Sequence, residues 1–169
     1  MNDSVEITNI KIKLGDKEIE LSLADAKKLK NVLEPLDLVI VKAEYGQGKR
    51  AKWITSYTVA CKSGEKLLEV GKVSTGLKEK AAGLTYLEMT KMLKPLIISE
   101  KGREAIVKPK IIIEVGYEEI QKSPSYSSGF ALRFPKVLRE RTNEKKLDEI
   151  NTIEDIKKIY NSQRAKKHN

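Results

Sequence analysis

The chain has 169 residues, which suits one domain or one domain with an appendage. Its net charge of +9 and pI of about 9.4 favour a polyanionic partner, although charge alone fits a merely basic surface equally well. A single cysteine and a single histidine exclude an internal disulfide and a Cys/His zinc site, and no apolar run is long enough to span a bilayer.

Residues 1–34 are predicted to form an N-terminal hairpin and helix extension. Residues 5–21 contain two segments of alternating apolar and polar side chains around a glycine-containing turn, which indicates a β-hairpin. Ser22 and Asp25 resemble a capping box, so a helix is expected to begin there and to end at Pro35.

Residues 35–146 are predicted to be mainly β. The strand candidates are 36–43, 54–61, 67–73, 111–117 and 130–138. A helix over 85–93 falls between the third and fourth of them, with Thr85 and Glu88 as a capping box and Pro95 after its end. Five strands with one inserted helix suit a five-stranded Greek-key barrel of the OB (oligonucleotide-binding) type.

Residues 147–169 are predicted to form a C-terminal helix followed by a basic tail. Thr152 is placed to cap a helix whose Ile153, Ile156 and Tyr160 share one face, and this face should pack on the barrel.

The sequence offers no catalytic residue. Cys61 lies in an alternating apolar run, which predicts a buried structural thiol, and His168 lies in the solvated tail. A lone cysteine also fits a reducing compartment, so we expect a cytoplasmic protein that is not held in a membrane.

The segment 130–141 is a strand-like run in which apolar residues and arginines are interleaved around a proline. Its first six residues, Phe-Ala-Leu-Arg-Phe-Pro, resemble the last conserved block of ATP-dependent DNA ligases of the archaeal and eukaryotic replicative type. Further blocks follow the order of the same family's C-terminal domain, at 33–41, 46–51, 68–76, 94–97 and 114–126.

This resemblance implies an OB-fold domain that grips double-stranded or nicked DNA during strand joining in replication and repair. The family's nucleophile is the lysine of a Lys-x-Asp-Gly motif, and that tetrapeptide does not occur here. The resemblance therefore implies no catalytic residue, metal or cofactor in this chain, whereas a full-length ligase would use ATP and Mg²⁺. The chain is then either part of a ligase, with an adenylation domain in the same or another chain, or a stand-alone non-enzymatic nucleic-acid-binding or regulatory module.

The resemblance assigns the residues of block 130–135 to DNA. Arg133 and Phe134 match a pair that lies in the minor groove beside the nick, where a phenylalanine acts as an apolar wedge. The alternative is that Phe134 fills the barrel core. Lys136 replaces a family arginine, which keeps the charge but loses bidentate geometry.

Two glycine-containing loops supply further cations. Lys49 and Arg50 are predicted to contact the phosphate backbone, with a solvated hairpin tip as the alternative. Lys72 either meets phosphate or belongs to a tight turn. Trp53 and Tyr57 share a strand face and either stack on bases or pack in the core.

The family's final motif is Arg-x-Asp-Lys, which helps to orient the pyrophosphate of ATP. Arg141 matches its arginine, but Asn143 and Glu144 stand where the aspartate and lysine are expected. Replacing a phosphate-facing cation with an anion reverses its electrostatic effect. Arg141 is therefore predicted either to contact nucleotide phosphate or to belong to a relaxed solvated turn.

Overall fold

The computed structural model describes residues 9–22, 34–77 and 84–167, and the chain divides into two units, residues 1–34 and 35–169. In the first unit, β1 (Asn9–Leu14) and β2 (Lys17–Ser22) form an antiparallel hairpin that turns at Gly15, as the alternation predicts. The predicted strand residues 5–8 and the predicted helix after Ser22 lie outside the described residues.

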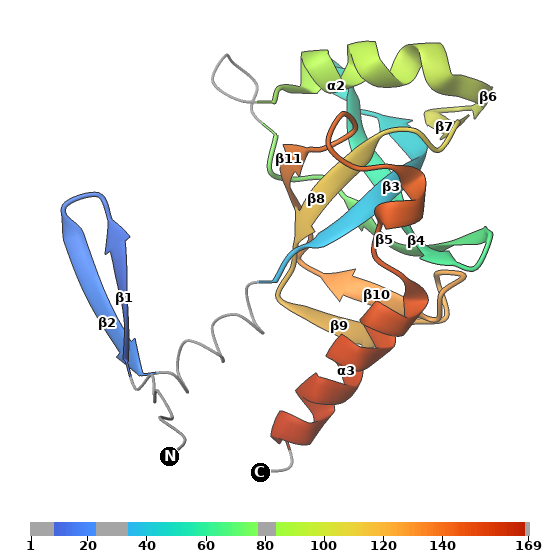
Figure 1. Cartoon of the computed structure of the whole chain (residues 1–169). Coiled ribbons are helices and arrows are strands. Elements are labelled where there is room, and N and C mark those ends of the chain that lie inside the picture. The colour runs from blue at the N-terminus through green and yellow to red at the C-terminus, as the bar shows by residue number, and fades with distance from the viewer. Residues whose placement is uncertain (1–8, 23–33, 78–83, 168–169) are drawn as a thin grey trace. The chain divides into compact units, whose positions relative to one another are not determined.

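The second unit is mainly antiparallel β, which confirms the predicted OB-type architecture (Figure 1). Its strands are β3 (Leu36–Tyr45), β4 (Ile54–Ser63), β5 (Lys66–Val73), β6 (Ile97–Lys101), β7 (Glu104–Val107), β8 (Ile112–Gly116), β9 (Glu119–Lys122), β10 (Phe130–Arg133) and β11 (Lys136–Glu140). Its helical segments are η1 (Gly48–Arg50), α2 (Tyr86–Leu93), η2 (Lys94–Leu96), η3 (Leu147–Glu149) and α3 (Ile153–Lys167).

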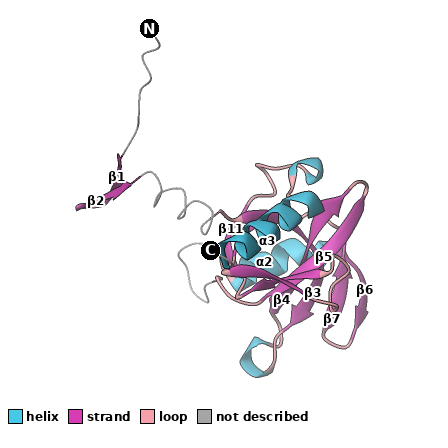
Figure 2. Cartoon of the chain, turned by 90° about the horizontal axis from the view of Figure 1, so that it is seen from below, coloured by secondary structure: helices cyan, strands magenta, loops and turns pink. Residues whose placement is uncertain are grey.

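Strand β3 is the centre of the larger sheet, whose main path runs β11-β8-β3-β4-β5. Its first half pairs with β8 and its second half with β7, because a register shift between Ile40 and Lys42 bends the strand. The bent strands wrap a core that includes Leu38, Tyr57 and Val115. Strands drawn in magenta make up most of this unit when it is seen from below (Figure 2).

Two capped helices complete the unit, with α2 at its top and α3 at its bottom in Figure 1. Thr85 and Glu88 form the predicted capping box of α2. Thr90 of α2 accepts a hydrogen bond from the Ile54 N–H at 2.9 Å, which ties the helix to the start of β4. The face of α3 that was predicted from Ile153 and Ile156 is buried against the core.

The predicted single strand over 130–138 is wrong in detail, because the structure breaks it into β10 and β11. Phe134 has a φ of +49° and Pro135 has no N–H to donate to a ladder, so pairing stops at these two residues. Strand β10 pairs with β9 in a separate two-stranded sheet, whereas β11 pairs with β8. The β6–β7 hairpin and β9 were not predicted.

No helix among the described residues is long and apolar enough to cross a membrane.

Candidate nucleic-acid interface

The break between β10 and β11 places Phe134 on the surface, where the residue is 64% exposed. A non-glycine residue at positive φ is strained by about 1–3 kcal/mol, and such strain persists only where neighbouring contacts hold it. Thr75 provides two of these contacts. Its hydroxyl donates to the Pro135 carbonyl at 3.1 Å, and its own carbonyl accepts from the Val137 N–H at 2.9 Å.

Arg133 lies directly beside Phe134. Its guanidinium carbon is 5.2 Å from the centroid of the Phe134 ring, and its Nη1 is 3.1 Å from Oε1 of Glu119 on β9. Lys136 begins β11 with an exposed side chain, and no ion pair of Lys136 occurs within the described ranges. The structure therefore brings together the three residues predicted in this segment, and Phe134 is not a core side chain.

Lys72 lies on the solvent-facing side of β5 and is already paired with Glu44 of β3. Glu44 also meets the Arg103 guanidinium at 3.5 Å. Two residues further along, Ser74 places its hydroxyl 2.9 Å from that of Ser56. A phosphate at Lys72 would compete with Glu44 for the same ammonium group.

The loop between β3 and β4 carries Lys49 and Arg50 on η1, both exposed. The Arg50 guanidinium carbon is 5.3 Å from the centroid of the Tyr86 ring, and Trp53 stacks on the same ring with centroids 6.5 Å apart. The Tyr86 hydroxyl in turn donates to the Ser74 carbonyl at 3.2 Å. Tyr86 was not singled out from the sequence, where it is only the first residue of a capped helix.

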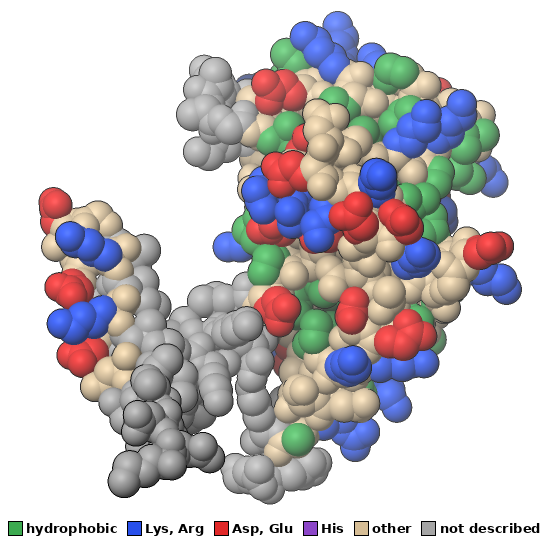
Figure 3. Space-filling view, in the orientation of Figure 1, with side chains coloured by type: hydrophobic (Ala, Val, Ile, Leu, Met, Phe, Trp, Pro, Cys, Tyr) green, Lys and Arg blue, Asp and Glu red, His purple; other side chains and the backbone are tan. Residues whose placement is uncertain are grey.

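These contacts join two parts of the chain that are distant in sequence. Arg50 rests on Tyr86, Tyr86 bonds to Ser74, and the next residue, Thr75, holds Pro135 beside Phe134. These contacts link the loop that carries Arg50 to the segment that carries Phe134. The candidate interface is taken as the six predicted residues Lys49, Arg50, Lys72, Arg133, Phe134 and Lys136. On the face of the molecule drawn in Figure 3, acidic and basic side chains are interspersed and do not form a continuous basic patch.

The two strand aromatics weighed for base stacking differ in position. Tyr57 is 1% exposed, and its hydroxyl donates to the Ile54 carbonyl at 2.8 Å, so it belongs to the core. Burial raises the pKa of Tyr57 far above its ordinary value. Trp53 is half-buried and packs on Tyr86.

Two glycines are needed for the shape of this interface. A Cβ at Gly46 would lie 2.8 Å from the Arg50 backbone oxygen, so a side chain there would displace the loop. Gly76 has a φ of +101°, and a Cβ there would lie 2.2 Å from the Val137 oxygen. The chain after β5 can pass this close to β11 only because residue 76 is glycine.

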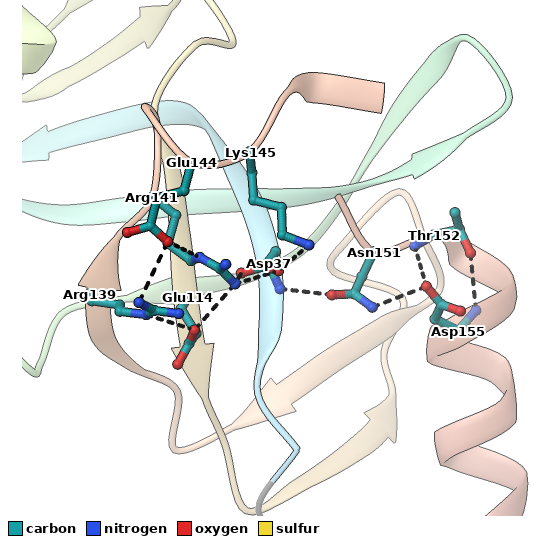
Figure 4. A network of polar contacts seen from close by, with 9 residues as sticks. All are labelled: Asp37, Glu114, Arg139, Arg141, Glu144, Lys145, Asn151, Thr152 and Asp155. Carbon is teal, nitrogen blue, oxygen red and sulfur yellow. Dashed lines mark hydrogen bonds and ion pairs between the residues drawn. The ribbon is translucent and has the colours of Figure 1, made fainter. Parts of the chain in front are cut away.

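Arg141 lies in a network of carboxylates that Figure 4 shows from close by. Its Nη1 is 3.0 and 3.1 Å from the two oxygens of Asp37, and its Nε is 3.1 Å from Glu144. Glu114 approaches the same guanidinium at 3.5 Å, and Lys145 pairs with Asp37 at 3.4 Å. Only 17% of the Arg141 side chain is exposed.

A phosphate group at this position would have to compete with three carboxylates that already pair with the guanidinium. The predicted contact of Arg141 with phosphate stays a prediction. The network instead joins β3, β8 and the end of β11. It extends to α3, because Asn151 accepts from the Asp37 N–H at 2.8 Å and donates to Asp155 at 3.0 Å.

The remaining candidates for chemistry are structural. Burial raises the pKa of the Cys61 thiol to about 11, which keeps it protonated and unreactive at neutral pH. Within residues 9–22, 34–77 and 84–167, no group of three or more His, Cys, Asp or Glu side chains is placed to hold a metal ion.

Comparison with known families and proteins identifies close relatives. The family described as the ATP dependent DNA ligase C terminal region matches residues 50–144, more than half of the chain. The DNA ligase of Nanoarchaeum equitans is 54% identical over 146 residues, which are 83% of this chain and 26% of that ligase. The DNA ligase of Archaeoglobus fulgidus is 46% identical over 138 residues, 80% of this chain and 24% of that ligase. The chain thus spans about a quarter of the length of these curated relatives.

Solved structures share the fold. The ligase domain from M. tuberculosis LigD superposes with a TM-score of 0.56 at 24% identity, over 70% of this chain and 38% of that one. The mycobacterial DNA ligase D complexed with ATP and MES gives 0.52 at 23% identity, over 70% and 37%.

Proposed function

The chain belongs to the family of ATP-dependent DNA ligase C-terminal regions, and we propose that it grips duplex DNA at a nick while the strands are joined in replication and repair. The observation that carries this proposal is Phe134. It is a bulky apolar side chain, 64% exposed, at a strained φ, with Arg133 and Lys136 on either side of the break. An exposed aromatic group held in a strained conformation among cations suits insertion into a groove of nucleic acid.

The roles of the interface residues follow from their chemistry. Lys49, Arg50 and Lys136 supply charge to phosphates and so set the position of the duplex without reading its sequence. Phe134 enters the minor groove as a wedge that supports a duplex distorted at the nick. Arg133 exchanges its partner Glu119 for a phosphate or a base edge when DNA binds.

In this proposal, the chemistry of joining belongs to a domain that carries the Lys-x-Asp-Gly nucleophile. That domain would hold ATP and Mg²⁺, and the present chain would close on the opposite side of the duplex. Its own contribution is then to orient the nick and to exclude water from it, which are positioning effects on the reaction.

The test compares Phe134→Ala and Arg133→Ala with the native chain, using thermal denaturation and fluorescence anisotropy on nicked duplex. Because Phe134 is exposed, its truncation should change the free energy of unfolding by no more than about 0.5 kcal/mol. It should nevertheless weaken binding to nicked duplex. Arg133→Ala should weaken binding too and flatten the log–log salt slope by about one unit if it contacts phosphate.

Ile98→Ala is the matched control, since Ile98 is 61% exposed on β6 and outside the candidate interface. It should bind as the native chain does. If Phe134→Ala binds nicked duplex with native affinity, the proposed wedge role of Phe134 is wrong. If the native chain does not bind duplex at low salt, the proposed DNA binding itself is wrong.

A further inference from the structure

A surface cavity of about 440 Å³ lies between β9 and α3, away from Lys49 and Arg50. Its volume falls in the range of roughly 300–1,000 Å³ that is usual for small-ligand sites. Its polar lining comes from Glu119, Gln121, Lys122, Tyr160, Gln163 and Arg164.

Two cations converge on one aromatic ring in this cavity. The Lys122 Nζ is 5.8 Å from the centroid of the Tyr160 ring, and the Arg164 guanidinium carbon is 5.9 Å from it. Each cation is thus held close to the same ring by a cation–π contact. Neither Lys122 nor Arg164 forms an ion pair in the part of the chain that the structure describes, so both charges are available to an anion.

The walls of the cavity are fixed by the fold. The Gln163 amide accepts from the Ile120 N–H at 2.9 Å and donates to the Ile120 carbonyl at 2.9 Å, which fastens α3 to β9. On its inner side the Tyr160 ring packs against Phe130, with centroids 5.3 Å apart. The cations are thus presented by elements that are already in place, which lowers the entropic cost of binding.

The cavity adjoins the candidate interface through one residue. Glu119 lines the cavity, and its Oε1 is 3.1 Å from the Arg133 Nη1 and 2.7 Å from the Gln121 amide nitrogen. Its negative charge is therefore offset by Arg133, and the net charge presented by Lys122 and Arg164 remains positive. Arg133 also contacts the Phe134 ring. The cavity, Arg133 and Phe134 are therefore linked by successive contacts.

We propose that the cavity between β9 and α3 binds a nucleotide phosphate. The DNA strand that continues past Phe134 is the source favoured by the adjoining interface, and in that form the inference rests on the proposed function. A free nucleotide carries the same phosphate chemistry, so the test separates the two sources.

The experiment uses the full chain and the double variant Lys122→Ala/Arg164→Ala. Its matched control is Lys66→Ala/Lys157→Ala, which removes the same charge from two exposed positions that do not line the cavity. Thermal denaturation first verifies that both variants fold. Anisotropy on nicked duplex is then measured across a salt series, and a separate NMR titration adds ATP without DNA.

If the cavity holds a DNA phosphate at each cation, the double variant should flatten the log–log salt slope by about 1.8 units relative to the native chain. Its deficit in affinity should then shrink about 12-fold between roughly 50 and 200 mM salt. The control pair should leave the slope nearly unchanged.

If the phosphate in the cavity comes from a free nucleotide instead of DNA, the experiment should give a different result. ATP alone would then shift the resonances of β9 and α3 in the native chain but not in the cavity variant, and both pairs of variants would bind DNA alike. Equal DNA binding by the two pairs, together with no shift on adding ATP, would overturn the proposal. A native chain that does not bind nicked duplex would defeat the proposed function alone, since the ATP titration still tests the cavity.

Discussion

Phe134 combines two properties that are each unfavourable for a folded chain: exposure of a large apolar surface and a positive φ. The left-handed conformation costs roughly 1–2 kcal/mol for a residue with a Cβ, because the Cβ crowds the following carbonyl oxygen. The proposed role as an apolar wedge would account for a phenylalanine at this position in place of a glycine.

The strain at Phe134 predicts that glycine is more stabilising than alanine there, which is the reverse of their usual order in a helix. Phe134→Gly should be more stable than Phe134→Ala by about 1 kcal/mol, because glycine adopts the observed φ without strain. Leu87 is the control: it is 47% exposed on α2, and there Leu87→Gly should be less stable than Leu87→Ala by about 1 kcal/mol. Urea denaturation measures both pairs. The same order at both positions would mean that Phe134 is not strained in solution.

At the scale of elements, the start of α3 is held by reciprocal bonds. The Thr152 hydroxyl accepts from the Asp155 N–H at 3.2 Å, and the Asp155 carboxylate accepts from the Thr152 N–H at 2.9 Å. Burial alone raises the pKa of Asp155, but the hydrogen bonds from Thr152 and Asn151 outweigh it and hold the pKa below its ordinary value.

Asp155→Ala should therefore lower the free energy of unfolding by about 1 kcal/mol at neutral pH. A carboxyl whose pKa is depressed by folding stabilises the protein above its unfolded pKa of about 3.9, and this stabilisation disappears as the pH falls through the folded value. The difference in unfolding free energy between the native chain and Asp155→Ala should then be smaller at acid pH than at neutral pH, as measured by urea denaturation under both conditions. Glu154→Ala, at an exposed neighbouring position, should show no such difference.

Most elements could be predicted because their own residues specify them. Helix α2 has its capping box, and β3, β4, β5 and β8 are long or strongly apolar runs. Strand β9 could not be found in this way, since it is short and only Ile120 of its four residues is buried. Pro135 is a visible signal of the break after β10, but the apolar and basic alternation continues through it, and the positive φ of Phe134 cannot be seen in the sequence.

The candidate interface was only partly accessible to sequence reasoning. Arg133 and Phe134 are adjacent in the chain, and their resemblance to a known block was enough to select them. The contacts that link the Arg50 loop through Tyr86 and Ser74 to the Phe134 segment depend on the tertiary fold, because these segments are far apart in the sequence. The pairing of Arg141 with Asp37 is likewise a property of the fold and not of either segment.

For the whole molecule, the division at residue 34 predicts that the second unit folds by itself. A two-stranded hairpin is marginally stable in isolation, and the core described for the second unit lies between Leu36 and Tyr160. Deleting residues 1–34 should therefore leave the thermal transition of residues 35–169 unchanged. Deletion from Ile153 onward is the contrasting case, because it removes Ile153 and Ile156 from the core and should lower the transition. Destabilisation by the first deletion would show that the two units depend on each other.

The hydrogen bonds of the Gln163 amide have a consequence for the exposed edge of β9. The amide offers β9 one acceptor and one donor, as a neighbouring strand would, and among the described strands β9 pairs only with β10. Helix α3 thus satisfies the two backbone groups of Ile120 on the edge of β9 with a single side chain. If the helix came away, the freed peptide groups of Ile120 would be a template on which an extended segment of another molecule could polymerise.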